Sequence, residues 1–217
     1  MGAIARNIAN NITTSGVFTS GAITNSSVTG ITVLANASDG ITLISSQTAS
    51  NSASLSFTSG LTSTYKAYKF VLVNIRPATD SVNFSFNLST DSGSNYNVTK
   101  TSSDFFAGHN EGDTNTYLEY DTNMDLAQST GEQKISDASG NDADQNLSGT
   151  ITLFNPSSTT YVKHFIGCTE ETYLGYAVNN YIAGYFNTTS AVNAIRFKFA
   201  SGNIVDGIIK LYGVKKS

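Results

Sequence analysis

The chain has 217 residues, of which only 13% are charged and 39% are hydrophobic, and its formal net charge is −4. It contains no basic stripe that could displace counterions from a phosphate backbone, and no apolar run approaches the roughly 20 residues that span a bilayer. We therefore expect neither nucleic acid nor a membrane among its partners. The single cysteine, Cys168, excludes an intrachain disulfide framework, and we expect a buried small side chain on a strand there.

Residues 1–40 differ in pattern from the rest of the chain. Small polar residues dominate this stretch, and single aliphatic side chains recur in it at Ile12, Val17, Ile23, Val28 and Val33. Such spacing cannot bury a core within one chain, but three copies wound together could share these side chains along a common axis. The pattern predicts an extended assembly arm that anchors and trimerises the protein. A low-complexity leader is the alternative.

From Ile41 onward the apolar residues recur with a period of two. Phe84, Phe86 and Leu88 alternate with polar residues, which predicts a strand with one apolar face and one wetted face. The run around Phe70 is apolar on both faces and predicts a central strand. Further segments of this kind lie at 55–57, 117–120, 147–154, 161–168, 181–186, 195–199 and 208–214.

Gly, Asn and Asp turns separate these segments, which predicts about eight to ten strands. We expect residues 41–217 to form an all-β domain, an antiparallel β-sandwich or jelly roll that follows the extended N-terminal assembly arm. One short helix is expected near residues 123–128.

Acidic side chains are concentrated in the middle of the chain, where ten of the sixteen carboxylates lie between residues 104 and 144. One spacing in this segment copies the first, third, fifth and twelfth positions of a calcium loop, at Asp121, Asn123, Asp125 and Glu132. Leu126, however, stands where the sharp turn of such a loop requires glycine. These four residues are weak candidate ligands for calcium, the one cofactor considered, and a solvated acidic loop is the favoured alternative.

Tyrosines gather in the segment TYLGYAVNNYIAGYF, residues 172–186, at Tyr173, Tyr176, Tyr181 and Tyr185. Tyrosines at loop tips make adhesive contacts with sugars or proteins, because a ring and a hydroxyl are offered together. Packing inside the sandwich or across a trimer interface is the alternative, and we favour packing.

No catalytic constellation is evident in the sequence. The two histidines, His109 and His164, lie outside any nucleophile motif. Glu170 and Glu171 cannot act as a pair on a strand, because adjacent strand residues point to opposite faces, and we expect them at a loop end. The sequence therefore predicts a protein that is not an enzyme.

The stretch FTSGLTSTYKAYKFVLVNIRPATDSVNFSFNLSTDSGSNYN, residues 57–97, is followed near the C-terminus by GIIKLYGVK, residues 207–215. Together they resemble virion structural proteins of tailed phages, a group that includes tail-fibre-like and head-decoration-like proteins. The resemblance extends over residues 41–217 and involves no catalytic motif. It implies a sandwich fold and a location on the outer surface of the tail or the capsid, and it supplies no site residues.

These observations predict a non-enzymatic phage virion structural protein, a trimeric tail-fibre or adhesin-type appendage anchored by its N-terminal arm. The expected partners are further copies of the chain, other virion proteins of the tail, portal or capsid, and a host surface glycan or protein. A capsid decoration protein that cements the head is the alternative. A carbohydrate-active jelly-roll enzyme is a remote alternative, because its carboxylate pair cannot be placed.

Overall fold

The computed structural model describes residues 40–215, which form thirteen strands and no helix. The strands are β1 (Ile41–Thr48), β2 (Leu55–Phe57), β3 (Ala67–Pro77), β4 (Phe84–Ser89), β5 (Lys100–Asn110), β6 (Thr116–Tyr120), β7 (Leu126–Ser129), β8 (Gln133–Lys134), β9 (Leu147–Phe154), β10 (Lys163–Tyr173), β11 (Tyr176–Phe186), β12 (Ala194–Phe199) and β13 (Ile204–Val214). The all-β prediction is confirmed. The helix predicted near residues 123–128 is wrong, because a turn at 122–124 leads directly into β7.

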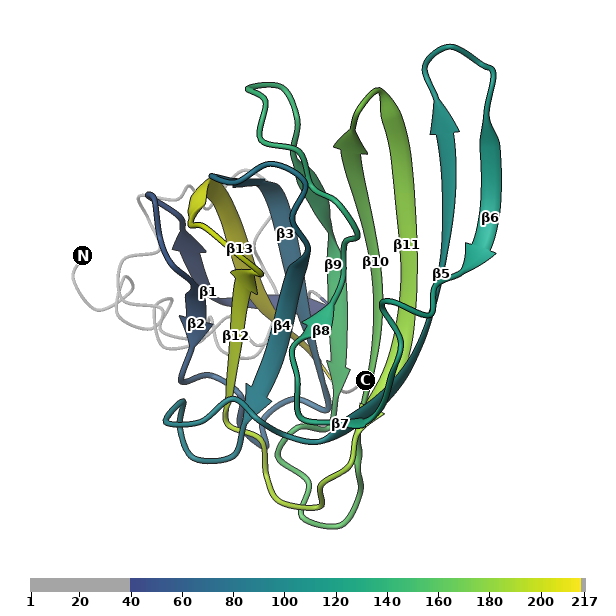
Figure 1. Ribbon diagram of the computed structural model, residues 1–217. Helices are drawn as coiled ribbons and strands as arrows, with labels where there is room; N and C mark the ends of the chain where they lie inside the picture. The colour runs from purple at the N-terminus through teal and green to yellow at the C-terminus, as the bar shows by residue number, and fades with distance from the viewer. Residues whose placement is uncertain (1–39, 216–217) are drawn as a thin grey trace, which may run out of the picture. The chain divides into compact units, whose positions relative to one another are not determined.

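The strands pair antiparallel in two sheets (Figure 1). The larger sheet has the order β1-β13-β3-β9-β10-β11-β5-β6, with β7 also paired to β5, and the smaller sheet has the order β2-β12-β4-β8. The chain crosses repeatedly from one sheet to the other, as in the successive strands β11, β12 and β13. Most strand neighbours are therefore distant in sequence, which the alternating pattern of residues alone cannot reveal.

Phenylalanine rings join the two sheets into a sandwich-like core. Phe57 of β2 packs against Phe70 of β3 with ring centroids 5.6 Å apart, and Phe86 of β4 packs against Phe165 of β10 at 5.3 Å. Phe197 of β12 lies between them and contacts four other rings. Each buried ring removes a large apolar area from water, worth about 1.5–3 kcal/mol, so these contacts stabilise the packing of one sheet on the other.

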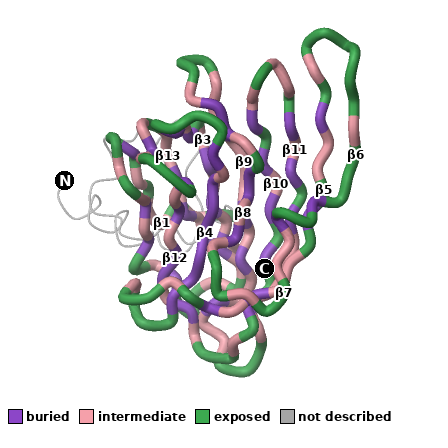
Figure 2. The backbone as a smooth tube through the Cα atoms, in the orientation of Figure 1, coloured by how far each residue is buried: buried purple, intermediate pink, exposed green. Residues whose placement is uncertain are grey.

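The hairpin of β10 and β11 is longer than the smaller sheet that covers it. Both strands have 11 residues, whereas β4 and β12 have 6 each. The ends that carry Phe165 and Phe186 lie in the core, while the turn end extends away from the smaller sheet (Figure 1). Burial is continuous along β4 and gives way to exposed backbone at β6 (Figure 2). One end of the larger sheet is therefore free to present side chains.

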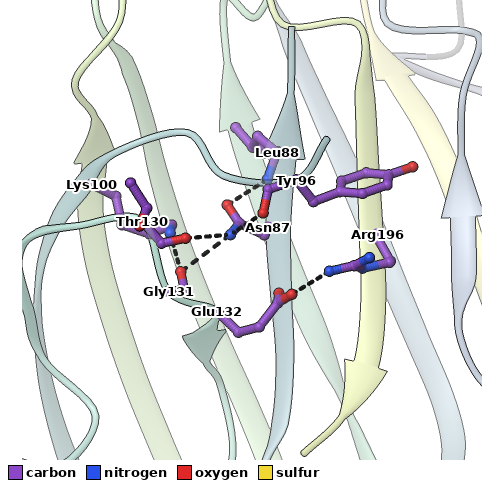
Figure 3. Close-up of polar contacts among 8 residues, drawn as sticks. All are labelled: Asn87, Leu88, Tyr96, Lys100, Thr130, Gly131, Glu132 and Arg196. Atoms are coloured by element: carbon purple, nitrogen blue, oxygen red, sulfur yellow. Dashed lines mark hydrogen bonds and ion pairs between the residues drawn. The ribbon is translucent and has the colours of Figure 1, made fainter. Parts of the chain in front are cut away.

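The polar face of β4 is buried rather than wetted, which corrects the sequence prediction. Asn87 is only 1% exposed, and its side-chain amide donates to the carbonyl oxygens of Tyr96, Thr130 and Gly131 at 2.8, 3.0 and 3.2 Å. Two loops thus cover this face and are tied to the strand by one side chain (Figure 3).

Charged side chains complete the same network (Figure 3). Lys100 is fully buried, donates to the Gly131 carbonyl and lies over the ring of Phe186. Burial lowers the pKa of Lys100 to about 8. Arg196 forms an ion pair with Glu132 and lies over the Tyr96 ring, 4.5 Å from its centroid.

The predicted arm lies almost wholly outside the described residues, which begin at Gly40. Its five aliphatic positions, Ile12 to Val33, therefore remain predictions. Cys168 lies on β10 as expected, but it is half-buried on the outer face instead of in the core.

Candidate functional site

The face of the larger sheet that looks toward the smaller one changes from apolar to polar along the β10–β11 hairpin. Phe165 and Ile182 belong to the hydrophobic core, whereas Thr169, Glu171 and Asn180 follow on the same face and are all buried. This sharing of a face follows from the antiparallel register, which pairs Thr169 with Asn180 and Glu171 with Val178. The polar positions begin where the smaller sheet no longer supplies phenylalanine rings.

Glu171 organises this polar region. Its side chain is 1% exposed and accepts hydrogen bonds from the backbone N–H groups of Asp137 and Ala138, at 2.9 and 3.3 Å. The Ser139 hydroxyl donates to it at 2.7 Å and the Asn180 amide at 3.4 Å. Burial raises the pKa of Glu171, and the four donors oppose that rise because they favour the carboxylate.

The expectation that Glu170 and Glu171 lie at a loop end is wrong, because both are inside β10. Their opposite orientation is as predicted, since Glu171 is buried and Glu170 is exposed. Glu171 was missed as a functional residue. The sequence could have indicated its position, because Glu171 lies two residues after Thr169 and six residues after Phe165. Even spacings along a strand place all three side chains on one face of the sheet.

Three tyrosines and Glu171 line a pocket at the turn end of the hairpin. The pocket has a volume of about 240 Å³ and lies among Tyr117 of β6, Tyr173 of β10 and Tyr176 of β11, with Asp137 on the facing loop. We call it the tyrosine pocket. Tyr173 and Tyr176 are opposite one another in the register and flank a two-residue turn at Leu174 and Gly175, where φ is 49° and 73°. These left-handed values are typical of a tight hairpin turn.

Tyr117 is brought into the pocket by a glycine on the neighbouring strand. A Cβ atom at Gly108 would lie 2.0 Å from Cζ of Tyr117, so only glycine leaves room for the ring to lie over β5. The rings of Tyr117 and Tyr176 are then 6.1 Å apart, centroid to centroid. The Tyr176 hydroxyl accepts a hydrogen bond from the Asn115 amide at 3.0 Å.

The pocket has an acidic electrostatic character. Glu171 and Asp137 line it, and no lysine, arginine or histidine does. The pKa of Tyr117 is raised by burial and by the negative charges of nearby groups, Asp137 and Glu171 among them. The arrangement is suited to holding a neutral or positively charged group against aromatic rings.

The four tyrosines singled out in the sequence divide between two faces of the sheet. Tyr173 and Tyr176 line the tyrosine pocket. Tyr181, 43% exposed, stacks on Phe105 on the outer face with ring centroids 5.0 Å apart, and Tyr185 lies beside His164 on that face. One adhesive surface containing all four is therefore not formed.

The outer face of the same strands carries a row of exposed apolar side chains. Phe105 of β5 is paired with Tyr181 of β11 on one side and with Tyr120 of β6 on the other. The three side chains therefore lie side by side across these strands. Other exposed apolar residues on this face are Ile166 and Leu118. We call this set the outer apolar row. Contiguous exposed apolar surface of this kind is typical of an interaction face.

The candidate calcium ligands already have partners within the chain. Asp121 accepts from the Asn123 backbone N–H at 2.7 Å, Asp125 accepts from the Tyr120 hydroxyl at 2.8 Å, and Glu132 pairs with Arg196. Within the described part of the chain, no three His, Cys, Asp or Glu side chains gather as metal ligands. The calcium site stays a prediction.

Asp104 is a second buried acid that the sequence did not single out. It is fully buried on β5, opposite Asp121, and neither of its carboxylate oxygens has a hydrogen-bond partner. Burial raises its pKa to about 7, with further contributions from the charges of Asp121, Asp137 and Asp125. Near neutral pH the carboxyl group of Asp104 therefore changes its protonation state.

The histidines occupy exposed positions. His109 lies 3.0 Å from Asp113 near the hairpin of β5 and β6, and His164 lies on the outer face beside Tyr185.

Between Gly40 and Lys215 the chain contains no helix long and apolar enough to cross a membrane. Comparisons with protein-family models, curated proteins and solved structures found no match to this chain.

Proposed function

We propose that this chain is a non-enzymatic structural protein of a tailed-phage particle, a trimeric tail-fibre or adhesin-type appendage whose sandwich domain attaches to the host. In this proposal residues 1–40 anchor the protein to the particle, and the sandwich is a jelly roll. The repeated crossing of the chain between the two sheets supports the jelly-roll assignment.

The tyrosine pocket is the observation that carries this proposal. It lies at the hairpin end that extends beyond the smaller sheet, where a ligand on another surface can reach it. Aromatic rings supply large contact areas at low entropic cost, and they are enriched in recognition sites. Glu171 holds the facing loop through both of its oxygens, so its role in the proposal is structural support of a binding site.

The outer apolar row supports self-association. Its members are exposed on a sheet face, and apolar area of this kind is stabilised when a further copy of the chain covers it. The same row favours the alternative function, a capsid decoration protein, because an apolar sheet face is also suited to packing against a shell.

Gold-labelled antibody against the full-length chain, applied to intact particles that contain it, tests the proposal. We expect label on the tail and roughly tens of copies per particle from band intensities, because each appendage is a closed trimer and a particle carries few appendages. Label over the whole head, with hundreds of copies, would favour decoration. Absence of the chain from purified particles would contradict both assignments.

Catalysis is tested separately. We expect no release of reducing sugar from host polysaccharide, because Glu170 and Glu171 lie on opposite faces of β10 and cannot flank one glycosidic bond. Release that depends on either glutamate would instead support the remote alternative, a carbohydrate-active enzyme.

A further inference from the structure

The chemistry of the tyrosine pocket restricts which ligand it can hold, an inference that rests on the proposed role of this pocket in attachment. Its walls are three tyrosine rings together with apolar side chains such as Leu174 and Val178. The carboxyl groups that border it belong to Asp137 and Glu171, with no basic side chain in the lining. An anionic group would be repelled and left without a partner there.

Some polar atoms of the pocket already have partners within the chain. Both Glu171 oxygens accept from backbone and side-chain donors, and the Tyr176 hydroxyl accepts from Asn115. A quaternary ammonium group can bind without displacing these hydrogen bonds, because its nitrogen carries no proton and needs no hydrogen-bond partner.

The rings and charges of the pocket complement a bulky organic cation. Tyrosine faces attract a desolvated cation, and tyrosines from three different strands line the space. Nearby carboxylates add attraction that does not depend on hydrogen-bond geometry. We propose that the tyrosine pocket binds a quaternary ammonium group, presented by the surface to which the protein attaches.

Binding of choline and of tetramethylammonium to the full-length protein, measured by calorimetry, tests this directly. We expect saturable binding of both and at least about tenfold weaker binding of the uncharged tert-butyl analogue of choline, because the analogue keeps the shape but loses the cation–ring attraction. Equal binding of the analogue would overturn the proposal, as would tighter binding of a neutral hexose.

Single substitutions separate the contributions that the tyrosine ring, the tyrosine hydroxyl and the carboxylate charge make to choline binding. Tyr176→Ala should weaken choline binding at least about tenfold, whereas Tyr176→Phe should retain it because the ring face is kept. Asp137→Asn should weaken it several-fold by removing one negative charge. The matched control is Tyr161→Ala, at an exposed tyrosine outside both the tyrosine pocket and the outer apolar row, which should bind choline as the unaltered chain does. Loss of binding in Tyr176→Phe would overturn the proposal, because it would show recognition through the hydroxyl.

Two model ligands distinguish which kind of molecule presents the quaternary ammonium group to the pocket. Phosphocholine and trimethyl-lysine both present a quaternary ammonium, the first as found on glycans and lipids and the second as found on proteins. Whichever binds more tightly identifies the carrier, and failure of both together with choline overturns the ligand assignment.

Failure of the ligand class and failure of the function are distinguishable. If choline does not bind but Tyr176→Ala still impairs attachment to host cells, the ligand class is wrong and the attachment role stands. If choline binds as expected but Tyr176→Ala attaches normally, the ligand class stands and the attachment role is wrong.

Discussion

The two ends of the β10–β11 hairpin are built from the same alternating pattern but have different chemistry. At one end Phe165 and Phe186 pack 5.4 Å apart, beneath the rings of the smaller sheet. At the other end Glu171 and the tyrosines occupy the equivalent face without a covering sheet. Strand length, relative to the sheet opposite, therefore decides which inward positions form core and which form a site.

Truncation of a side chain should destabilise the protein more at the covered end of the hairpin than at the uncovered end. Phe197→Ala removes a fully buried ring that contacts four others, and we expect it to lower the free energy of unfolding by about 3–5 kcal/mol. Denaturant unfolding measures this as a lower midpoint at an unchanged slope. A loss below about 1 kcal/mol would contradict the assignment of the core to the contact between sheets.

The polar end depends on Glu171. Glu171→Ala leaves two backbone N–H groups and a serine hydroxyl without their acceptor, so we expect a loss of about 2–3 kcal/mol. The matched control is Glu170→Ala, one residue earlier on the exposed face, which should change stability by less than about 0.5 kcal/mol. Equal effects of the two substitutions would show that Glu171 does not anchor the facing loop.

Asp104 should make stability depend on pH. Its pKa is raised from 3.8 to about 7, so the folded chain holds this proton more tightly than the unfolded chain does. The free energy of unfolding contributed by Asp104 is fully present below pH ~4, is lost as pH rises towards ~7, and is constant above that, with a total loss of up to about 4 kcal/mol.

The comparison between Asp104→Asn and the unaltered chain isolates this effect, because all other carboxyl groups are shared. Urea unfolding at a series of pH values should show a steeper decline between pH ~4 and ~7 in the unaltered chain than in the variant. Parallel pH profiles would exclude Asp104 as the group responsible.

The outer face should matter least for folding. Tyr181→Ser breaks one stacked pair on exposed surface, and we expect a loss of less than about 1 kcal/mol. The same substitution should weaken self-association in analytical ultracentrifugation if the outer apolar row joins copies of the chain. Unchanged association would place the contact between copies elsewhere.

The alternation of residues was sufficient to predict an all-β fold and most strands, because a half-buried strand needs little more than period two. It failed for the polar face of β4, since the loops that cover Asn87 come from residues distant in sequence. The site was only partly predictable for the same reason. Tyr173 and Tyr176 are close in sequence, but Tyr117 reaches them only through the pairing of β5 with β6 and β11.

The claim that the uncovered hairpin end is a recognition site is tested most directly by attachment of particles to host cells. Particles carrying Tyr176→Ala and particles carrying Tyr161→Ala are compared at equal incorporation of the protein. We predict that Tyr176→Ala slows adsorption several-fold and that Tyr161→Ala, at an exposed tyrosine outside the pocket and the outer apolar row, leaves its rate unchanged. Normal adsorption by Tyr176→Ala particles would contradict the account.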